Sequence, residues 1–167
     1  TINHLKKDGN PANYKTIYEM YMDLNARQEA IKPVLPLRVN NQNITFDFND
    51  YTDDIVTSKA NVSSYFYDEG VKLLNSDDKQ TIRQAFKTLD YVEKINPNYR
   101  DVRQLLDEAY EKGTIYVSVS IHNETNQIIP RRLEDDLLNF DTYGLDQFWV
   151  EYHANADSNI DYDYAMK

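Results

Sequence analysis

Apolar residues in the middle of the chain, from about residue 51 to residue 113, recur at steps of three and four, the spacing of an amphipathic helix. The pattern predicts three successive helices, of which the second covers residues 78–95 and the third residues 98–113. Pro97 ends the second helix, Asn98 is the expected N-cap of the third, and Gly113 closes the third. Because the connections are short, we expect the three helices to pack as antiparallel neighbours.

The first 50 residues predict one more helix, followed by an irregular crossover. Apolar positions in residues 13–31 have a helical period, and prolines at 33 and 36 end this helix. The preceding residues 1–11 are polar and predict a frayed lead-in. Apolar and polar residues then alternate over residues 44–48. This alternation indicates a short strand or an extended segment whose aromatic side chains cover the helices.

After residue 113 the apolar period changes from helical to alternating. Alternation over residues 115–121 and 148–152 predicts two strands, and leucines in residues 133–138 predict a short helix between them. A strand, helix, strand order favours parallel pairing, with the leucines packed across one face of the strands. Two strands alone leave open edges, so we expect a further strand, a docked neighbour or a partner chain to cover one of them.

The predicted fold class is therefore α+β and mainly α. A helical domain is expected over residues 1–113, with a long N-terminal helix, a crossover and three further helices. A small strand-helix-strand unit is expected over residues 114–167, as the start of a longer α/β domain. Because the chain begins with Thr1, we expect a mature form or a fragment.

About one and a half units of the helical region carry a motif of aromatic, glycine, alanine and proline residues. The residues at these places are Phe66, Gly70, Ala85 and Pro97. In this respect the region resembles a tetratricopeptide repeat, in which two antiparallel helices form each unit. The resemblance implies that Gly70 and Ala85 face each other where the two helices approach most closely. It also implies a scaffold that binds a protein or a peptide, without enzyme activity.

The predicted strand that ends in the sequence IHNET, followed by a leucine-bearing helix, resembles the opening of α/β modules in bacterial envelope lipoproteins. The whole chain is similar to a Gram-negative cell-envelope lipoprotein. This resemblance implies a periplasmic or outer-membrane-associated protein, with a lipid anchor upstream of the first residue.

The composition excludes several functional classes. The net charge is −10, and no basic patch is present, which disfavours nucleic acids and anionic membranes as partners. The absence of cysteine excludes disulfides and thiolate chemistry. No apolar run is long enough to span a membrane. No phosphate-binding loop or nucleophile motif occurs, so we expect no enzyme activity, no catalytic residue and no cofactor.

The chain contains 14 tyrosines, and tyrosine is favoured at interfaces because it combines apolar area with a polar tip. Several lie along one side of the first long helix or flank a phenylalanine, and the alternative is that they line the core. The candidate partner-binding residues are Tyr14, Tyr18, Tyr21, Tyr65 and Tyr67.

A second hypothesis places a carbohydrate- or metal-binding module in the C-terminal strands. Trp149 and Tyr152 are candidates for stacking on a sugar. If the two strands pair, His122 and His153 with Glu151 have the ligand types that suit zinc. Solvated surface histidines are the simpler interpretation, so we predict no metal site.

Overall fold

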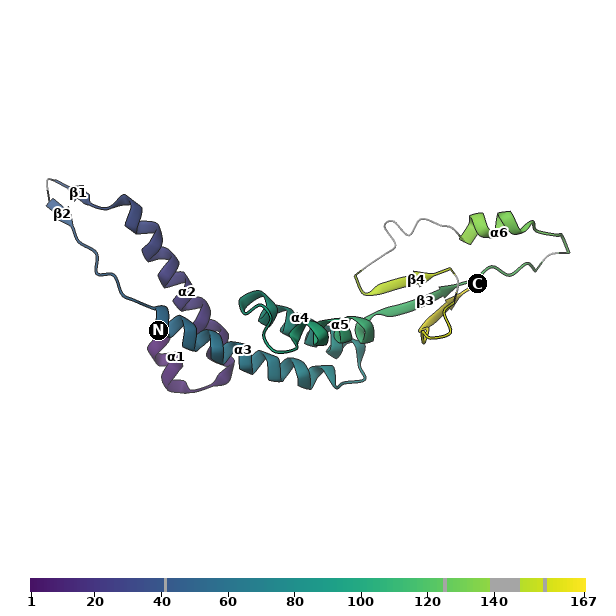
Figure 1. Cartoon of the computed structure of the whole chain (residues 1–167), viewed down its shortest axis with the longest axis horizontal. Helices are drawn as coiled ribbons and strands as arrows, with labels where there is room; N and C mark the ends of the chain where they lie inside the picture. The colour runs from purple at the N-terminus through teal and green to yellow at the C-terminus, as the bar shows by residue number, and fades with distance from the viewer. Residues whose placement is uncertain (41, 125, 139–147, 155) are drawn as a thin grey trace.

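The computed structural model describes residues 1–40, 42–124, 126–138, 148–154 and 156–167, and it confirms an α+β fold that is mainly α. Figure 1 shows an elongated arrangement, with helices at one end and in the middle and most strands at the other end. The helices are α1 (Ile2–Asp8), α2 (Tyr14–Ile31), α3 (Thr52–Leu74), α4 (Lys79–Ile95), α5 (Val102–Gly113) and α6 (Arg131–Leu138). The strands are β1 (Leu37–Val39), β2 (Gln42–Ile44), β3 (Ile115–Val119), β4 (Val150–His153) and β5 (Tyr164–Met166).

The three central helices lie where the sequence predicts them, with local signals at their ends. Asp78 caps α4, because its carboxylate accepts a hydrogen bond from the backbone N–H of Thr81 at 2.8 Å. The predicted cap of α5 at Asn98 is wrong. This residue lies in a left-handed turn with φ 62°, and its N–H donates to Glu93, so α5 begins three residues later, after Asp101.

The core of the helical region is divided into two clusters along α4. Buried residues near the start of α4 are Leu74, Ile82, Ala85 and Ala109, and those near its end are Leu89, Val92 and Val102. The residue that packs on Gly70 is Leu89, not Ala85 as the repeat resemblance implies. Gly70 therefore sits one helical turn along α4 from its expected partner, and Ala85 packs between α3 and α5.

The N-terminal region differs from the prediction in two respects. Residues 2–8 form α1 instead of a frayed lead-in, and Gly9 ends this helix in a left-handed conformation with φ 65°. The crossover after α2 contains a hairpin, in which Leu37 pairs with Ile44. Phe46 and Phe48 follow the hairpin, each 39% exposed, so they do not cover the helices as expected.

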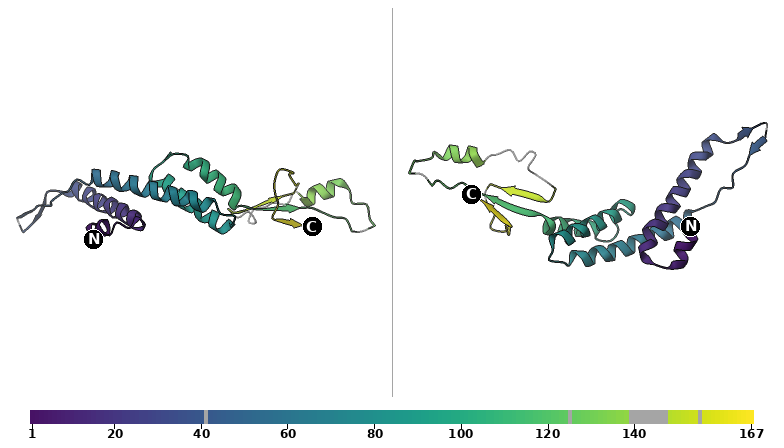
Figure 2. Two further views of the ribbon diagram at one scale, coloured as in Figure 1. Left: turned by 90° about the horizontal axis from the view of Figure 1, so that it is seen from below. Right: turned by 180° about the vertical axis from the view of Figure 1, so that it is seen from behind.

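We call residues 22–51 the N-terminal arm. Figures 1 and 2 show the outer part of α2 projecting away from the other helices, with the β1–β2 hairpin at its tip. The chain that returns to α3 is tied to α2 by Gln28, whose amide exchanges two hydrogen bonds with the backbone of Asn49, at 2.8 and 2.7 Å.

The C-terminal strands form a parallel sheet in the order β4-β3-β5. The parallel pairing of β3 with β4 is confirmed, with Val117 opposite Tyr152. The strand β5, which the sequence did not reveal, covers the other edge of β3, with Val117 opposite Tyr164. The expected leucine cover is wrong, because Leu133 is 49% exposed and α6 lies away from the strands in Figure 1.

The sheet is held to the helices by Trp149 instead. Its indole packs against Phe86 of α4 and Tyr110 of α5, with ring centroids 5.2 and 5.8 Å apart. Gly113 provides the space for this ring, since a Cβ there would lie 2.8 Å from an indole carbon. The hydroxyl of Tyr110 also donates to Glu151 of β4 at 3.0 Å. These contacts set the start of β4 against the end of α5.

Candidate functional site

The five candidate tyrosines do not form a single exposed surface. Tyr18 and Tyr21 are only 8% and 6% exposed, because they lie where α2 packs on α3. Their side chains offer almost no surface to a protein partner while that packing is intact. Tyr14 and Tyr65 are half-buried and meet edge to face, with ring centroids 5.9 Å apart.

Tyr67 lies farther along α3 and joins this helix to the start of α5. Its hydroxyl donates to the carboxylate of Asp101 at 2.6 Å, and its ring packs against Tyr99 at 5.8 Å between centroids. The hydrogen bond to Asp101 and partial burial raise the pKa of Tyr67. The guanidinium of Arg100 lies 4.6 Å from the ring centroid, so one face of the phenol already has a cationic neighbour.

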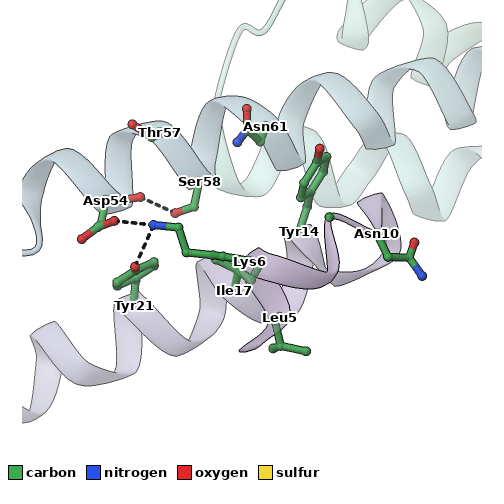
Figure 3. Close-up of a pocket in the computed structure, with 11 residues that line it drawn as sticks. Leu5, Lys6, Asn10, Tyr14, Ile17, Tyr21, Asp54, Thr57, Ser58 and Asn61 are labelled. Atoms are coloured by element: carbon green, nitrogen blue, oxygen red, sulfur yellow. Dashed lines mark hydrogen bonds and ion pairs between the residues drawn. The ribbon is translucent and has the colours of Figure 1, made fainter. Parts of the chain in front are cut away.

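A pocket of about 190 Å³ lies at the junction of α1, α2 and α3 (Figure 3). The helix α2 contributes its floor, α3 forms one wall, and α1 with the turn after it forms the other. Its lining residues are Leu5, Lys6, Gly9, Asn10, Tyr14, Ile17, Tyr21, Asp54, Thr57, Ser58 and Asn61.

The charged groups of the pocket are Lys6 and Asp54. The ammonium of Lys6 donates to Asp54 at 3.0 Å and to the hydroxyl of Tyr21 at 3.2 Å. The bond to Asp54, and then the bond to Tyr21, raise the pKa of Lys6, and the bond from Lys6 lowers the pKa of Asp54. Both side chains are about half exposed, at 49% and 40%. Water therefore screens this pair, which positions α1 more than it stabilises the fold.

Three of the six neutral polar side chains that line the pocket have no hydrogen-bond partner within the described part of the chain. There, the amide of Asn61 and the hydroxyls of Thr57 and Tyr14 form no hydrogen bond with another protein group. Ser58 donates to the backbone carbonyl of Asp54 at 2.7 Å, which leaves its oxygen able to accept. Sequence reasoning missed this site because it treated residues 1–11 as frayed. The glycine at position 9 was the available signal for a helix end.

The N-terminal arm carries a high share of the exposed apolar side chains. Among the described residues, fourteen large apolar side chains are exposed, and half of them belong to the arm. The seven in the arm are Met22, Leu24, Val34, Leu37, Ile44, Phe46 and Phe48. A second hollow, at the base of the arm, is shared by α1, α2 and the start of α3 and adjoins the first pocket at Tyr21 and Asp54.

The aromatic candidates in the strands already have neighbours within the chain. Trp149 contacts Phe86 and Tyr110, and the guanidinium of Arg83 lies 5.3 Å from its ring centroid. Tyr152 is half-buried in the sheet. Their role in stacking on a sugar stays a prediction.

The structure does not bring the two strand histidines together. His153 lies opposite Ser118, and its Nδ1 is 2.8 Å from the hydroxyl of Tyr162. His122 is exposed beyond the end of β3. Within the described residues, no three histidine, aspartate or glutamate side chains are grouped so that they could hold a metal ion.

Comparison of the chain with protein-family models, with curated proteins and with solved structures finds no match in any of the three. In the described part of the chain, no helix combines the length and the apolar character that crossing a bilayer requires.

Proposed function

We propose that this chain is a non-enzymatic scaffold that binds a protein or peptide partner in a bacterial cell envelope, with the N-terminal arm as the contact surface. The helices α3 to α5 serve as a tetratricopeptide-like support. The observation that carries this proposal is the exposure of seven large apolar side chains on one projecting segment. The envelope location rests on the resemblance to lipoproteins alone.

Exposed apolar side chains are common when scattered, but their concentration on one segment is typical of interaction sites. The outer half of α2 has no helix packed against it in Figure 1, so its apolar side chains gain little from folding. A partner that covered these side chains would remove their apolar area from water, which stabilises the covered state by about 25 cal/mol for each Å² buried.

The charge distribution indicates the chemistry of the partner. Residues 1–50 carry six basic and six acidic side chains, so this region is neutral although the chain has a net charge of −10. The arm itself, residues 22–51, carries three basic and four acidic side chains, a net charge of −1. This nearly neutral surface favours a partner patch that is apolar and has no strong net charge. The acidic remainder of the chain keeps it soluble and repels acidic partners.

Site-specific photocrosslinking tests the proposal. Benzoylphenylalanine replaces Phe48 in the arm or, as a matched control, Phe148, which is 59% exposed near the strands. Each protein is irradiated in an extract of the source cell, and the crosslinked partner is identified and purified. We expect a discrete adduct from position 48 and none from position 148.

The purified partner then decides the question. Its affinity for the chain should fall at least about tenfold when both Phe46 and Phe48 are replaced by serine, since central aromatic side chains dominate interface energetics. Because both side chains are exposed, these replacements should leave the unfolding midpoint unchanged. An unchanged dissociation constant, or equal adducts from both crosslinker positions, would refute the arm as the contact surface.

A further inference from the structure

We propose that the pocket between α1, α2 and α3 binds a free apolar amino acid of about the size of valine or leucine, in its zwitterionic form. This small-molecule site is separate from the exposed apolar surface of the arm, and it does not depend on the proposed partner binding. Figure 3 shows the lining residues on three helices, with Lys6, Tyr21 and Asp54 pointing toward one another.

The size of the pocket limits its ligand to a small molecule. Its volume of about 190 Å³ holds roughly six waters at the volume that each occupies in the liquid. Pockets for drug-sized ligands start at about 300 Å³. A branched amino acid therefore fits, whereas a folded peptide or a nucleotide does not.

The charges of the pocket favour a ligand that carries both signs. Lys6 uses two of its three protons on Asp54 and Tyr21, so one proton remains for a ligand carboxylate. The carboxylate of Asp54 has acceptor capacity beyond its bond with Lys6, which suits a ligand ammonium. The charged groups of Lys6 and Asp54 are 3.0 Å apart. A zwitterionic ligand would place its carboxylate beside Lys6 and its ammonium beside Asp54.

A ligand with a single charge fits less well. A carboxylate alone would place an anion beside Asp54, and an amine alone would place a cation beside Lys6. Either arrangement introduces an unbalanced charge at a partly enclosed site, which is costly. A neutral sugar would use the hydroxyls but would leave the ion pair without a role.

The rest of the lining matches the other parts of an amino acid. Asn61 and Thr57 on α3 supply a donor and acceptors that the described protein groups do not use, and these can fix the orientation of the ligand carboxylate. Leu5 and Ile17 supply apolar contacts for the side chain, and the ring of Tyr14 lies at one end. Ile17 is only 6% exposed, so the half-buried Leu5 supplies most of the apolar surface that a ligand could contact.

Isothermal titration of the full chain tests the site, with L-leucine as the probe. We expect saturable binding of one leucine per chain, with a dissociation constant below about 1 mM. The compounds 4-methylpentanoate and 3-methylbutylamine, which lack the amino and carboxyl groups of leucine respectively, should each bind at least about tenfold more weakly. Equal binding of either one, or binding of glucose in place of leucine, would overturn the inference.

A matched pair of variants locates the binding. Asn61→Leu places a larger side chain in the pocket wall, and Ala60→Leu places the same side chain at the next exposed position, which does not line the pocket. We expect at least about a tenfold loss of leucine binding for the first variant and no change for the second. Both should keep the circular dichroism spectrum of the parent chain. No heat from leucine at millimolar concentration, or equal affinities for the two variants, would refute the site.

The role of the ion pair is tested by Asp54→Asn, which should abolish leucine binding. Because this change also weakens the contact between α1 and α3, crosslinking of the arm to its partner is measured in parallel. Partner binding should persist in Asp54→Asn and Asn61→Leu, since neither changes the exposed apolar side chains of the arm. Loss of leucine binding is thereby distinguished from failure of the proposed function.

Discussion

Gly70 marks the closest approach of α3 to α4, and its replacement by alanine tests whether the two helices meet as described. A Cβ at this position would lie 2.7 Å from both Cγ and Cδ2 of Leu89. Favourable contact between carbon atoms requires about 3.5–4.0 Å, so one of the two groups must move by roughly 1 Å. Leu89 is fully buried against Val92 and Val102, and it has little room to yield.

Two opposing effects set the size of the change. Alanine is favoured over glycine in a helix interior by about 1 kcal/mol. Overpacking a well-filled core costs about 1–3 kcal/mol. We therefore expect Gly70→Ala to lower the free energy of unfolding by about 0–2 kcal/mol, instead of raising it as at an open helical position. Urea denaturation followed by circular dichroism at 222 nm gives this free energy.

A double-mutant cycle isolates the contact from the helix preference. In a Leu89→Ala background the obstructing side chain is absent, so Gly70→Ala should stabilise the chain by about 1 kcal/mol. The difference between the two backgrounds, about 1–3 kcal/mol, is the cost of the steric contact. If Gly70→Ala stabilises the otherwise unchanged chain by the full helix preference, Leu89 does not pack on this glycine and the described geometry is refuted.

Two further predictions concern the core and the sheet. Ala85→Leu should lower the free energy of unfolding by about 1–3 kcal/mol in urea melts, because Ala85 is fully buried, whereas Gln84→Leu at the neighbouring exposed position should have little effect. Asp163→Asn should cost about 1–2 kcal/mol and speed amide exchange in β5, because this carboxylate accepts bonds from Lys79 and from the backbone N–H of Tyr116, each at 2.9 Å. Burial acts to raise the pKa of Asp163, but these hydrogen bonds outweigh it and lower the pKa. The stabilisation by Asp163 is thus complete above the unfolded-state pKa of about 4, and it is lost as the pH falls through the lower folded-state pKa. If the unchanged chain and Asp163→Asn unfold identically in acid, this prediction is contradicted.

The central helices could be predicted from the sequence because the signals that define them are local. Each has a regular apolar stripe, and Asp78 and Pro97 mark a start and a stop that involve only nearby backbone groups. The parallel pairing of β3 with β4 is not local, but the order of strand, helix and strand indicated it, because such a connection favours parallel strands.

The elements that were missed depend on contacts between residues far apart in the chain. The strand β5 has three residues, in a polar segment without a clear period, and its position is set in part by the bond between Asp163 and Lys79. The helix α1 buries none of its residues completely and is held by Lys6 contacting a carboxylate 48 positions away. Neither contact has a signature in the local pattern.

The candidate site was only partly predictable for a similar reason. Tyrosines at helical spacing indicate a face, but they do not show whether another helix covers it. In the structure, α3 covers Tyr18 and Tyr21, while Tyr14 stays partly accessible at the edge of the pocket. The polar wall at Thr57, Ser58 and Asn61 gave no sequence signal, since small polar residues on a helix are normally solvated.

The packing of α2 explains how the proposed partner would stabilise the arm. Its buried residues, Ile17, Tyr18 and Tyr21, all lie in its first half. The remaining ten residues, 22–31, extend about 15 Å beyond this contact. Isolated helices shorter than about 12–15 residues are marginal in water, so this segment is supported mainly by its continuity with the packed half and by the bonds from Gln28 to Asn49.

A partner that covered the exposed apolar side chains would add the tertiary contacts that the outer half of α2 lacks. Binding and ordering of the arm would then be coupled, and part of the interaction free energy would be spent on fixing the helix and the hairpin.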